Sequence, residues 1–321
     1  MKYILGLSKQ DFKLSKFEAE ESLNVKSKGN KELLLVNLSD KKAKAIEKLA
    51  YTNHAYEVLF ESSSKELLNK INKYNWQNKY KKNYCVRCIN LNVSNERKYA
   101  DIIWNMIKKP KVDLENANTE FVFIKLSNKI FVTKLIWKNE KKFLGRKAHL
   151  RPELHPSSLD PRLAKACVNI AVGFDGEKGN KKKKVLDPFC GTCGILIEAG
   201  LLGHNIIGCD LDEIMARKGV INLEHYNIKK YEIGLRNALS FDEKVDAVVT
   251  DIPYGKNTKA NDIEVVVKKF LENTYKFSKK VVIMFPFDTK YKKLIGKWKV
   301  KAEFKHYLHK SLSKRIVVLV K

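Results

Sequence analysis

The 321-residue sequence contains no apolar run as long as the roughly 18 residues that a membrane helix needs. Its start also lacks the hydrophobic segment of a secretory signal peptide. We therefore expect a soluble, cytoplasmic protein without a membrane partner. A chain of this length, with an ordinary hydrophobic share of 44%, has enough apolar side chains for two or more domains.

The six cysteines do not indicate a disulfide framework or a zinc site. Cys85 and Cys88 form one C-x-x-C pair and Cys190 and Cys193 another, with no histidine cluster near either pair. The first pair falls in a strand-like run, where residues three apart point to opposite faces. No bound metal is therefore expected. We expect Cys190 and Cys193 to line a tight pocket as small residues, with a redox pair as the alternative.

Acidic residues are scarce relative to basic ones. The chain has 36 Asp and Glu against 63 Lys and Arg, a formal net charge of +27. Such an excess predicts a polyanionic partner, most simply a nucleic acid. A second explanation weakens this argument. Lys, Asn, Ile and Tyr are all abundant, and a coding bias toward A and T would produce that abundance without selection for binding.

Two familiar nucleotide-binding fingerprints are also missing. Residues 185–200 read VLDPFCGTCGILIEAG, which predicts a short strand, a tight loop and an apolar helix. The spacing of Gly191 and Gly194 fits neither G-x-G-x-x-G nor G-x-x-x-x-G-K-[ST]. A loop with one acid, Asp187, and few glycines suits a cationic or zwitterionic ligand better than a pyrophosphate. S-adenosylmethionine has this character, and an ordinary strand–loop–helix corner is the alternative.

Four consecutive predicted strands end in polar residues, which are Asp187, Asp210, Asn237 and Asp251. Ligands of open α/β sheets bind at the carboxyl ends of the strands, so these side chains are expected to meet at one site. Asp210 lies roughly 20 residues beyond the loop, where such folds place a carboxylate on ribose hydroxyls. The pattern predicts an α/β, doubly wound Rossmann-like domain.

The segment after the fourth strand, Asp251-Ile252-Pro253-Tyr254, resembles the (Asp/Asn)-Pro-Pro-(Tyr/Phe) loop of amino-methyltransferases. An exocyclic amine is a poor nucleophile because its lone pair is delocalised into the ring. Two acceptors on its N–H bonds, Asp251 and the carbonyl of Ile252, would orient it and stabilise the positive charge that develops on nitrogen. Pro253 brings no competing N–H, and Tyr254 offers a flat face for stacking of the target base.

The first 140 residues predict alternating strands and helices, which suggests two small α+β layers, each with one covered face. Ser39 and Asp40 are expected to cap the second helix. The expected strands are 2–7, 32–38, 54–60 and 84–90, the helices are 12–23, 43–51, 64–71 and 95–107, and a hairpin joins 120–126 to 129–137. Aromatic and basic residues alternate at Tyr74, Trp76, Lys79, Tyr80, Lys81, Lys82 and Arg87. They predict either an RNA-stacking surface or a solvated face.

A segment rich in charge and proline follows and is expected to be a linker. A helix is expected to begin at Ser158 or Asp160 and to run through Ala171. The linker contains His155, and a lone histidine before a proline is more often structural than catalytic.

In order and spacing, residues 155–164 (HPSSLDPRLA), the 185–200 stretch and residues 251–255 (DIPYG) resemble the THUMP-containing guanosine-N2 tRNA methyltransferases. The archaeal branch that modifies tRNA position 10 is the most similar, and residues 309–316 (HKSLSKRI) resemble that family's final hairpin. The resemblance implies a seven-stranded catalytic sheet and an S-adenosylmethionine cofactor. It also implies that the THUMP part holds the acceptor end of tRNA.

The resemblance also implies which residues surround the cofactor. Asp210 would bind the ribose, Asn237 would meet the adenine amine, and the His-Pro-Ser-Ser segment would close over the ligand. The full set expected to bind the cofactor is His155, Pro156, Ser157, Ser158, Asp187, Phe189, Cys190, Gly191, Gly194, Asp210, Asn237 and Ala238.

We therefore predict an N-terminal ferredoxin-like part (1–52), a THUMP RNA-binding part (53–138), a linker (139–160) and a Rossmann-fold methyltransferase domain (161–321). The expected reaction is methylation, once or twice, of the N2 amine of a tRNA guanosine at position 10. tRNA is the expected partner, without DNA or an obligate protein partner, and the protein is expected to be a monomer. The alternatives are a related enzyme acting at tRNA position 6, on ribosomal RNA or on an adenine amine, and a non-catalytic tRNA-binding protein.

Overall fold

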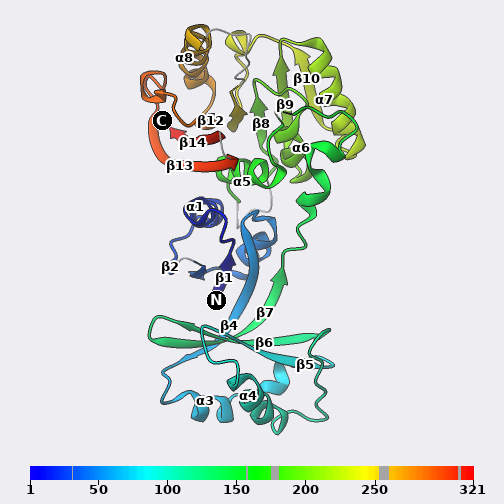
Figure 1. Cartoon of the computed structure of the whole chain (residues 1–321), viewed down its shortest axis with the longest axis vertical. Coiled ribbons are helices and arrows are strands. Elements are labelled where there is room, and N and C mark those ends of the chain that lie inside the picture. Colours follow the sequence, from blue (N-terminus) through cyan, green and yellow to red (C-terminus); the bar gives the residue numbers. More distant parts are fainter. Residues whose placement is uncertain (31, 157, 175–180, 253–259, 310–311) are drawn as a thin grey trace. The chain divides into compact units, whose positions relative to one another are not determined.

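The computed structural model describes residues 1–30, 32–156, 158–174, 181–252, 260–309 and 312–321. They form two compact units, each built on a seven-stranded sheet (Figure 1). The first unit comprises Met1–Phe12, Val25–Glu47 and Thr52–Glu140, and the second comprises Lys13–Asn24, Lys48–Tyr51 and Lys141–Lys321. None of the helices in these described ranges is long and apolar enough to cross a membrane.

The first unit contains one continuous sheet. In sheet order its strands are β2 (Lys28–Gly29), β3 (Leu33–Asn37), β1 (Lys2–Leu7), β4 (Thr52–Ser62), β7 (Lys129–Lys138), β6 (Thr119–Leu126) and β5 (Tyr84–Ile89). The two small α+β layers expected in these residues therefore share one sheet. The long strands β4 and β7 pair with each other from His54 to Ser62, so both halves of the unit hydrogen-bond to one central ribbon.

Helices α3 (Leu67–Lys73) and α4 (Asn95–Trp104) cover the β5–β6 end of this sheet on one side (Figure 1). Their apolar residues pack on an aromatic cluster that includes Trp76, Tyr84 and Phe121, all fully buried. The indole of Trp76 donates a hydrogen bond of 2.9 Å to the Ile71 carbonyl. A stacking role on RNA is therefore wrong for Trp76, because its ring forms part of the core.

The expected helix 43–51 is also wrong in its extent. Ser39 caps the segment as expected, since its hydroxyl accepts from Lys42 N, but the helix is only α2 (Asp40–Ala43), followed by a 3₁₀ turn (Lys44–Lys48). The helix cannot continue because the next amides are bound elsewhere. The carboxylate of Glu18 accepts from Ala50 N at 2.7 Å and from Tyr51 N at 2.9 Å.

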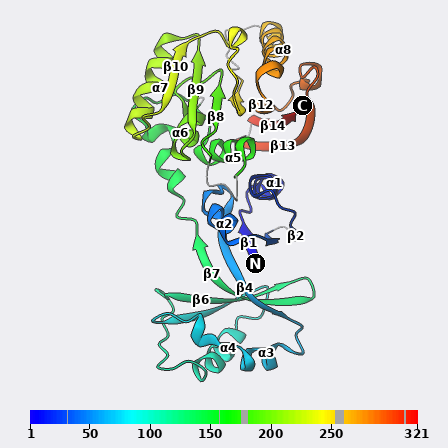
Figure 2. The same ribbon diagram turned by 180° about the vertical axis from the view of Figure 1, so that it is seen from behind.

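The sheet of the second unit is doubly wound. In order its strands are β10 (Tyr231–Leu235), β9 (Asn205–Asp210), β8 (Lys184–Asp187), β11 (Ala247–Asp251), β12 (Lys280–Pro286), β14 (Leu312–Val320) and β13 (Lys299–His309), which Figures 1 and 2 show from opposite sides. The first five are parallel, and β14 runs antiparallel between β12 and β13. The expected seven-stranded α/β fold is confirmed.

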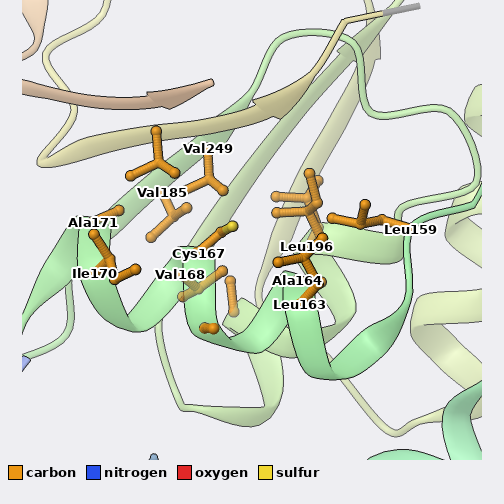
Figure 3. Packing of buried hydrophobic residues seen from close by; sticks show 14 of the residues in the cluster. Leu159, Leu163, Ala164, Cys167, Val168, Ile170, Ala171, Val185, Leu196 and Val249 are labelled. Atoms are coloured by element: carbon orange, nitrogen blue, oxygen red, sulfur yellow. The ribbon is translucent and has the colours of Figure 1, made fainter. Parts of the chain in front are cut away.

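The apolar runs of β8 and β11 follow from burial on both faces of this sheet. Val185 and Val249 point into a cluster with α5 (Pro161–Val172) and α6 (Gly194–Leu201). Leu186 and Val248 point into the opposite cluster with α8 (Ala260–Phe277). Figure 3 shows the first cluster close to α5.

Helix α5 begins as the sequence predicts. Asp160 is its N-cap and accepts from Arg162 N and Leu163 N at 2.9 and 3.2 Å, and Pro161 occupies the first turn. Helix α1 (Phe12–Leu23) packs beside α5 in the second unit. There Glu18, which is fully buried, accepts a third hydrogen bond of 2.7 Å from Asn169 Nδ2.

Candidate active site

Three acidic residues stand at the carboxyl ends of adjacent parallel strands. The order β9–β8–β11 brings Asp210, Asp187 and Asp251 to the same edge of the sheet. Their charges act on one another, because Asp251 and Asp210 both raise the pKa of Asp187. The convergence expected from the sequence is therefore present, and it makes this edge of the sheet acidic.

Asp187 is a buried carboxyl group, 2% exposed. It accepts hydrogen bonds from Thr250 Oγ1 at 2.8 Å and from Phe189 N at 3.2 Å. Burial raises the pKa of Asp187 to about 7, and the charges of Asp251 and Asp210 add to this rise. The two hydrogen bonds lower the pKa but do not cancel the effect of burial. Asp187 can therefore gain or lose a proton near neutral pH, and a nearby cation would favour its ionised form.

The loop after β8 is tied to β9 by two hydrogen bonds that backbone amides of the loop donate. Cys190 N donates to the Cys209 carbonyl at 2.9 Å, and Gly191 N donates to Asp210 Oδ2 at 2.8 Å. Gly191 (φ +49°) and Cys193 (φ +63°) both adopt the left-handed conformation, and Cys193 is the N-cap of α6. The turn directs the first amides of α6 toward the strand ends, where they can bind a polar ligand.

Helix α7 (Glu213–His225) approaches this loop closely through Gly219. A Cβ atom at that position would lie 2.5 Å from Cys193 Sγ and 3.0 Å from the Gly191 carbonyl oxygen. The loop and helix therefore fit together only with glycine at position 219.

Replacing Gly219 by alanine is expected to destabilise the protein by about 1–3 kcal/mol, the usual cost of overpacking. A glycine-to-alanine change inside a helix ordinarily stabilises a protein by up to about 1 kcal/mol. A net loss of stability at position 219 would therefore be caused by the clash with the loop. Urea unfolding measures the effect. Adding Cys193→Gly should restore most of the loss, because it removes Sγ and suits the positive φ. A Gly219→Ala protein as stable as the wild type would contradict this packing.

The linker residues lie against the same loop. Ser158 Oγ and Thr192 Oγ1 are 3.1 Å apart, and the His155 carbonyl accepts from Ser158 N at 3.0 Å. His155 is half-buried and Pro156 is exposed, while Ser157 lies outside the described residues. The segment expected to close over a cofactor thus lies beside the loop that follows β8.

Asn222 of α7 fixes the linker in this position. Its Oδ1 accepts from Glu153 N at 3.0 Å, and its Nδ2 donates to the carbonyls of Glu153 (3.0 Å) and Thr192 (3.2 Å). The side chain is fully buried. Asn222 was missed in the sequence, although an amide among the apolar residues of a helix is a signal that could have indicated it.

A second anchor ties the preceding part of the linker to α6. Arg146 donates to both carboxylate oxygens of Glu198 at 2.7 Å in a bidentate pair. Arg151 is 5% exposed and donates from Nε to the Arg146 carbonyl at 3.0 Å. The linker is therefore held on the second unit at several points before it reaches the loop.

Asp251 ends β11, and its Oδ2 accepts a hydrogen bond from Lys314 Nζ in β14. Ile252 is buried and donates its N–H to the Met284 carbonyl at 3.2 Å, so the backbone is fixed up to that residue. Burial raises the pKa of Asp251, and Lys314 opposes that rise. Pro253 and Tyr254 lie outside the described residues.

Asn237 and Ala238 follow β10 at the far side of the acidic edge. Asn237 is exposed, and its Oδ1 accepts from Leu239 N at 2.9 Å, which caps a short 3₁₀ turn (Ala238–Ser240). Ala238 is buried. An adenine amine bound here would share Oδ1 with Leu239, because an amide oxygen has two lone pairs.

Three cysteines, Cys190, Cys193 and Cys209, are buried around the loop as free thiols. A hydrogen bond with Cys193 and then burial raise the pKa of Cys190, and burial raises that of Cys209 to about 11. The thiols of Cys190 and Cys209 are therefore neutral at pH 7 and poor nucleophiles. The described residues contain no group of three or more His, Cys, Asp or Glu side chains able to hold a metal ion.

The fold and the strand-end acids define a methyltransferase domain, and residues 148–314 match the family model described as "UPF0020: RMKL-like, methyltransferase domain". The chain is 35% identical over 262 residues to the tRNA (guanine(10)-N2)-dimethyltransferase of Methanocaldococcus jannaschii, covering 75% of this chain and 71% of that protein. Identity to the protein of the same name from Pyrococcus abyssi is 31% over 283 residues, 83% of each. The chain belongs to this family of archaeal methyltransferases.

A solved structure shares the fold over the full length of the chain. TrmN from Thermus thermophilus matches with a TM-score of 0.54 at 16% identity, covering 100% of both chains. This likeness extends the structural comparison to the first unit, which lies outside the matched family model.

Proposed function

We propose that the protein transfers methyl groups from S-adenosylmethionine to the exocyclic N2 amine of a guanosine in tRNA, at position 10. The products are N2-methylguanosine and N2,N2-dimethylguanosine. The observation that carries the proposal is Asp251, a carboxylate acceptor held at the end of β11 beside the loop of the methyltransferase domain. The relatives in Methanocaldococcus and Pyrococcus carry this activity in their names.

The site residues suit this cofactor. Bound S-adenosylmethionine supplies an electrophilic methyl group on a sulfonium. Asp187, buried with only Thr250 and Phe189 as its hydrogen-bond donors in the described structure, has charge to balance the cofactor's amino group. Asp210 would accept from the ribose hydroxyls through the lone pairs that the amides of Gly191 and Asp212 leave open. The other residues proposed to line the site are His155, Pro156, Ser157, Ser158, Phe189, Cys190, Gly194, Asn237 and Ala238.

The target amine is held by two acceptors, Asp251 and the Ile252 carbonyl, while the base stacks on Tyr254 beside Pro253. Asp251 and the Ile252 carbonyl would hold N2 in line with the methyl group that the cofactor would supply, with the cofactor's sulfur leaving as a neutral thioether. They would stabilise the positive charge on nitrogen until it loses one proton to water. After the first transfer one N–H remains, so a single acceptor suffices to orient the amine for the second transfer.

In this proposal RNA binding belongs to a ferredoxin-like part (1–52) and a THUMP part (53–138), which the linker joins to the catalytic domain (161–321). The net charge of +27 supports contacts to phosphates. We propose that the protein acts in the cytoplasm as a monomer, without a further protein subunit.

Two tRNA transcripts that differ only at position 10 test the proposal. The transcript with guanosine there should accept one or two methyl groups from labelled S-adenosylmethionine, and the transcript with adenosine there should accept none. Equal labelling of both would overturn the assignment to position 10 and favour another tRNA guanosine. Label in ribosomal RNA alone would favour the related-enzyme alternative. Tight tRNA binding without any transfer would favour a non-catalytic role.

The affinity for S-adenosylmethionine is expected to rise between about pH 6 and pH 8. The raised pKa of Asp187, about 7, leaves much of this carboxyl group protonated and neutral at the lower pH. The cationic cofactor favours the ionised form, so binding strengthens as the proton is lost, by up to about tenfold per pH unit below the pKa. Titration calorimetry at several pH values measures this dependence.

Asp187→Asn is the matched control, because the amide oxygen can still accept from Thr250 and Phe189. This variant should bind the cofactor more weakly at pH 8 and should lose the part of the pH dependence that Asp187 causes. A wild-type affinity that stays constant from pH 6 to pH 8 would contradict a contact between Asp187 and the cofactor.

A further inference from the structure

The carboxylate of Asp251 is bound by an ammonium group from a strand two positions away. Lys314 lies in β14, and β12 separates that strand from β11. The registers pair Asp251 with Met284 and Lys314 with Pro286, so the lysine side chain reaches across the end of β12. The side chains of Lys314 and Asp251 are only 16% and 18% exposed. Neither charge is well solvated, so each depends on the other.

Both side chains lie on the face of the sheet that α5 covers. Lys314 stands two residues before Ile316, and Asp251 stands two residues after Val249. Ile316 and Val249 belong to the same buried cluster, and alternate residues of a strand share a face. Cys167 of α5 lies in this cluster opposite Val249 (Figure 3). The ion pair therefore lies at the end of this apolar cluster, next to Ile316 and Val249 on the same face of the sheet.

The other groups near this ion pair do not supply a positive charge that could take the place of Lys314. Cys167 is fully buried, and burial, with Asp251 next, raises the pKa of its thiol. Asp187 stands at the neighbouring strand end with a charge of the same sign as Asp251. His306 of β13 pairs with Lys314 in the sheet register and is buried. Without Lys314, Asp251 would be a poorly solvated acid beside a second acid, which favours its protonated form.

We infer that Lys314 is a positioning residue that keeps Asp251 ionised and holds one of its oxygens, so that the other oxygen can accept from the substrate amine. The inference rests on the proposed function only in taking Asp251 as that acceptor. A protonated Asp251 would present a donor where the amine also presents donors. The ammonium group also makes the carboxylate a weaker hydrogen-bond acceptor. The ion pair therefore keeps Asp251 ionised at neutral pH but lowers its strength as an acceptor.

The test combines a direct titration of Asp251 with the pH profile of the reaction. The variants are Lys314→Met, Lys314→Arg and Lys305→Met. Lys305 is the matched control, because it lies on the neighbouring strand β13 with its Nζ 4.2 Å from the Phe287 ring centroid, away from Asp251. Carbon-13 labelling of the aspartates lets NMR follow the carboxyl groups, and Asp251→Asn identifies the Asp251 signal.

In Lys314→Met, Asp251 should titrate at a higher pH than in the wild type. The acidic limb of kcat/KM should move to higher pH with it, with a loss of tenfold or more on that limb that recovers as the pH is raised. Lys314→Arg should keep the wild-type titration and profile, since guanidinium also stabilises a carboxylate, and Lys305→Met should match the wild type in both.

An unchanged titration of Asp251 in Lys314→Met would overturn the inference, and so would an equal shift in Lys305→Met. The NMR titration needs no substrate, so it decides the inference even if the wild-type protein transfers no methyl group to tRNA. If Lys314→Met does not fold, Lys314→Gln replaces it, because glutamine keeps a donor but removes the charge. A normal titration in the glutamine variant would then overturn the role of the charge.

Discussion

Replacing Asp251 by alanine is expected to lower the turnover number for tRNA methylation about 10³-fold or more, as loss of an acceptor that acts in the transition state implies. The carboxylate is one of the two acceptors proposed to orient the amine. tRNA affinity should be unchanged, because phosphate contacts elsewhere supply most of the binding energy. Single-turnover kinetics and filter binding on the same transcript separate the two quantities.

Asp251→Asn is the matched control for this experiment. The amide retains one acceptor oxygen but loses the charge that pairs with Lys314. Its rate should lie between those of the wild type and Asp251→Ala. An Asp251→Ala protein that methylates at nearly the wild-type rate would show that the acceptor mechanism is wrong, and a large loss of tRNA affinity would show that the residue acts in binding instead.

Replacing Glu18 by alanine is expected to lower the free energy of unfolding by about 3–5 kcal/mol, because the buried amide donors that it binds lose their acceptor. Glu18 is fully buried and accepts from Ala50 N, Tyr51 N and Asn169 Nδ2 at 2.7 to 2.9 Å. Its loss leaves three buried donors without an acceptor, each at a cost of about 1–3 kcal/mol before the structure relaxes. Urea unfolding followed by circular dichroism measures the change.

Glu20→Ala is the control on the same helix. Glu20 forms an i,i+4 ion pair with Lys16 at 3.9 Å and is 28% exposed in its side chain. Such a pair contributes only about 0–1 kcal/mol. Equal losses for Glu18→Ala and Glu20→Ala would mean that the buried network does not stabilise α1 against α5.

The strands of the catalytic sheet could be predicted because their apolar runs end at polar residues. Strands β9 (Asn205–Asp210) and β10 (Tyr231–Leu235) have the ends that the sequence indicates. Their parallel order then brings the terminal acids together, so Asp187, Asp210 and Asp251 followed from local patterns. The capping of α5 by Asp160 was predictable for the same reason, since a cap is a contact between near neighbours.

Contacts between distant parts of the chain could not be predicted in this way. The pair of Lys314 and Asp251 depends on the insertion of β14 between β12 and β13, which no local pattern specifies. The early end of this helical segment depends on Glu18, which lies 32 and 33 residues before Ala50 and Tyr51, the residues whose amides it binds. Asn222 contacts the linker only because α7 packs beside the loop that follows β8. Each of these residues is polar and at least partly buried, and its partner is known only once the fold is known.

The most direct test of the proposed function is nucleoside analysis by mass spectrometry after incubation of the protein with labelled S-adenosylmethionine and unmodified total tRNA. We predict label in N2-methylguanosine and N2,N2-dimethylguanosine, and in no other nucleoside. Label in a methylated adenosine, or no label in tRNA at all while a known tRNA methyltransferase labels the same preparation, would contradict the proposed function.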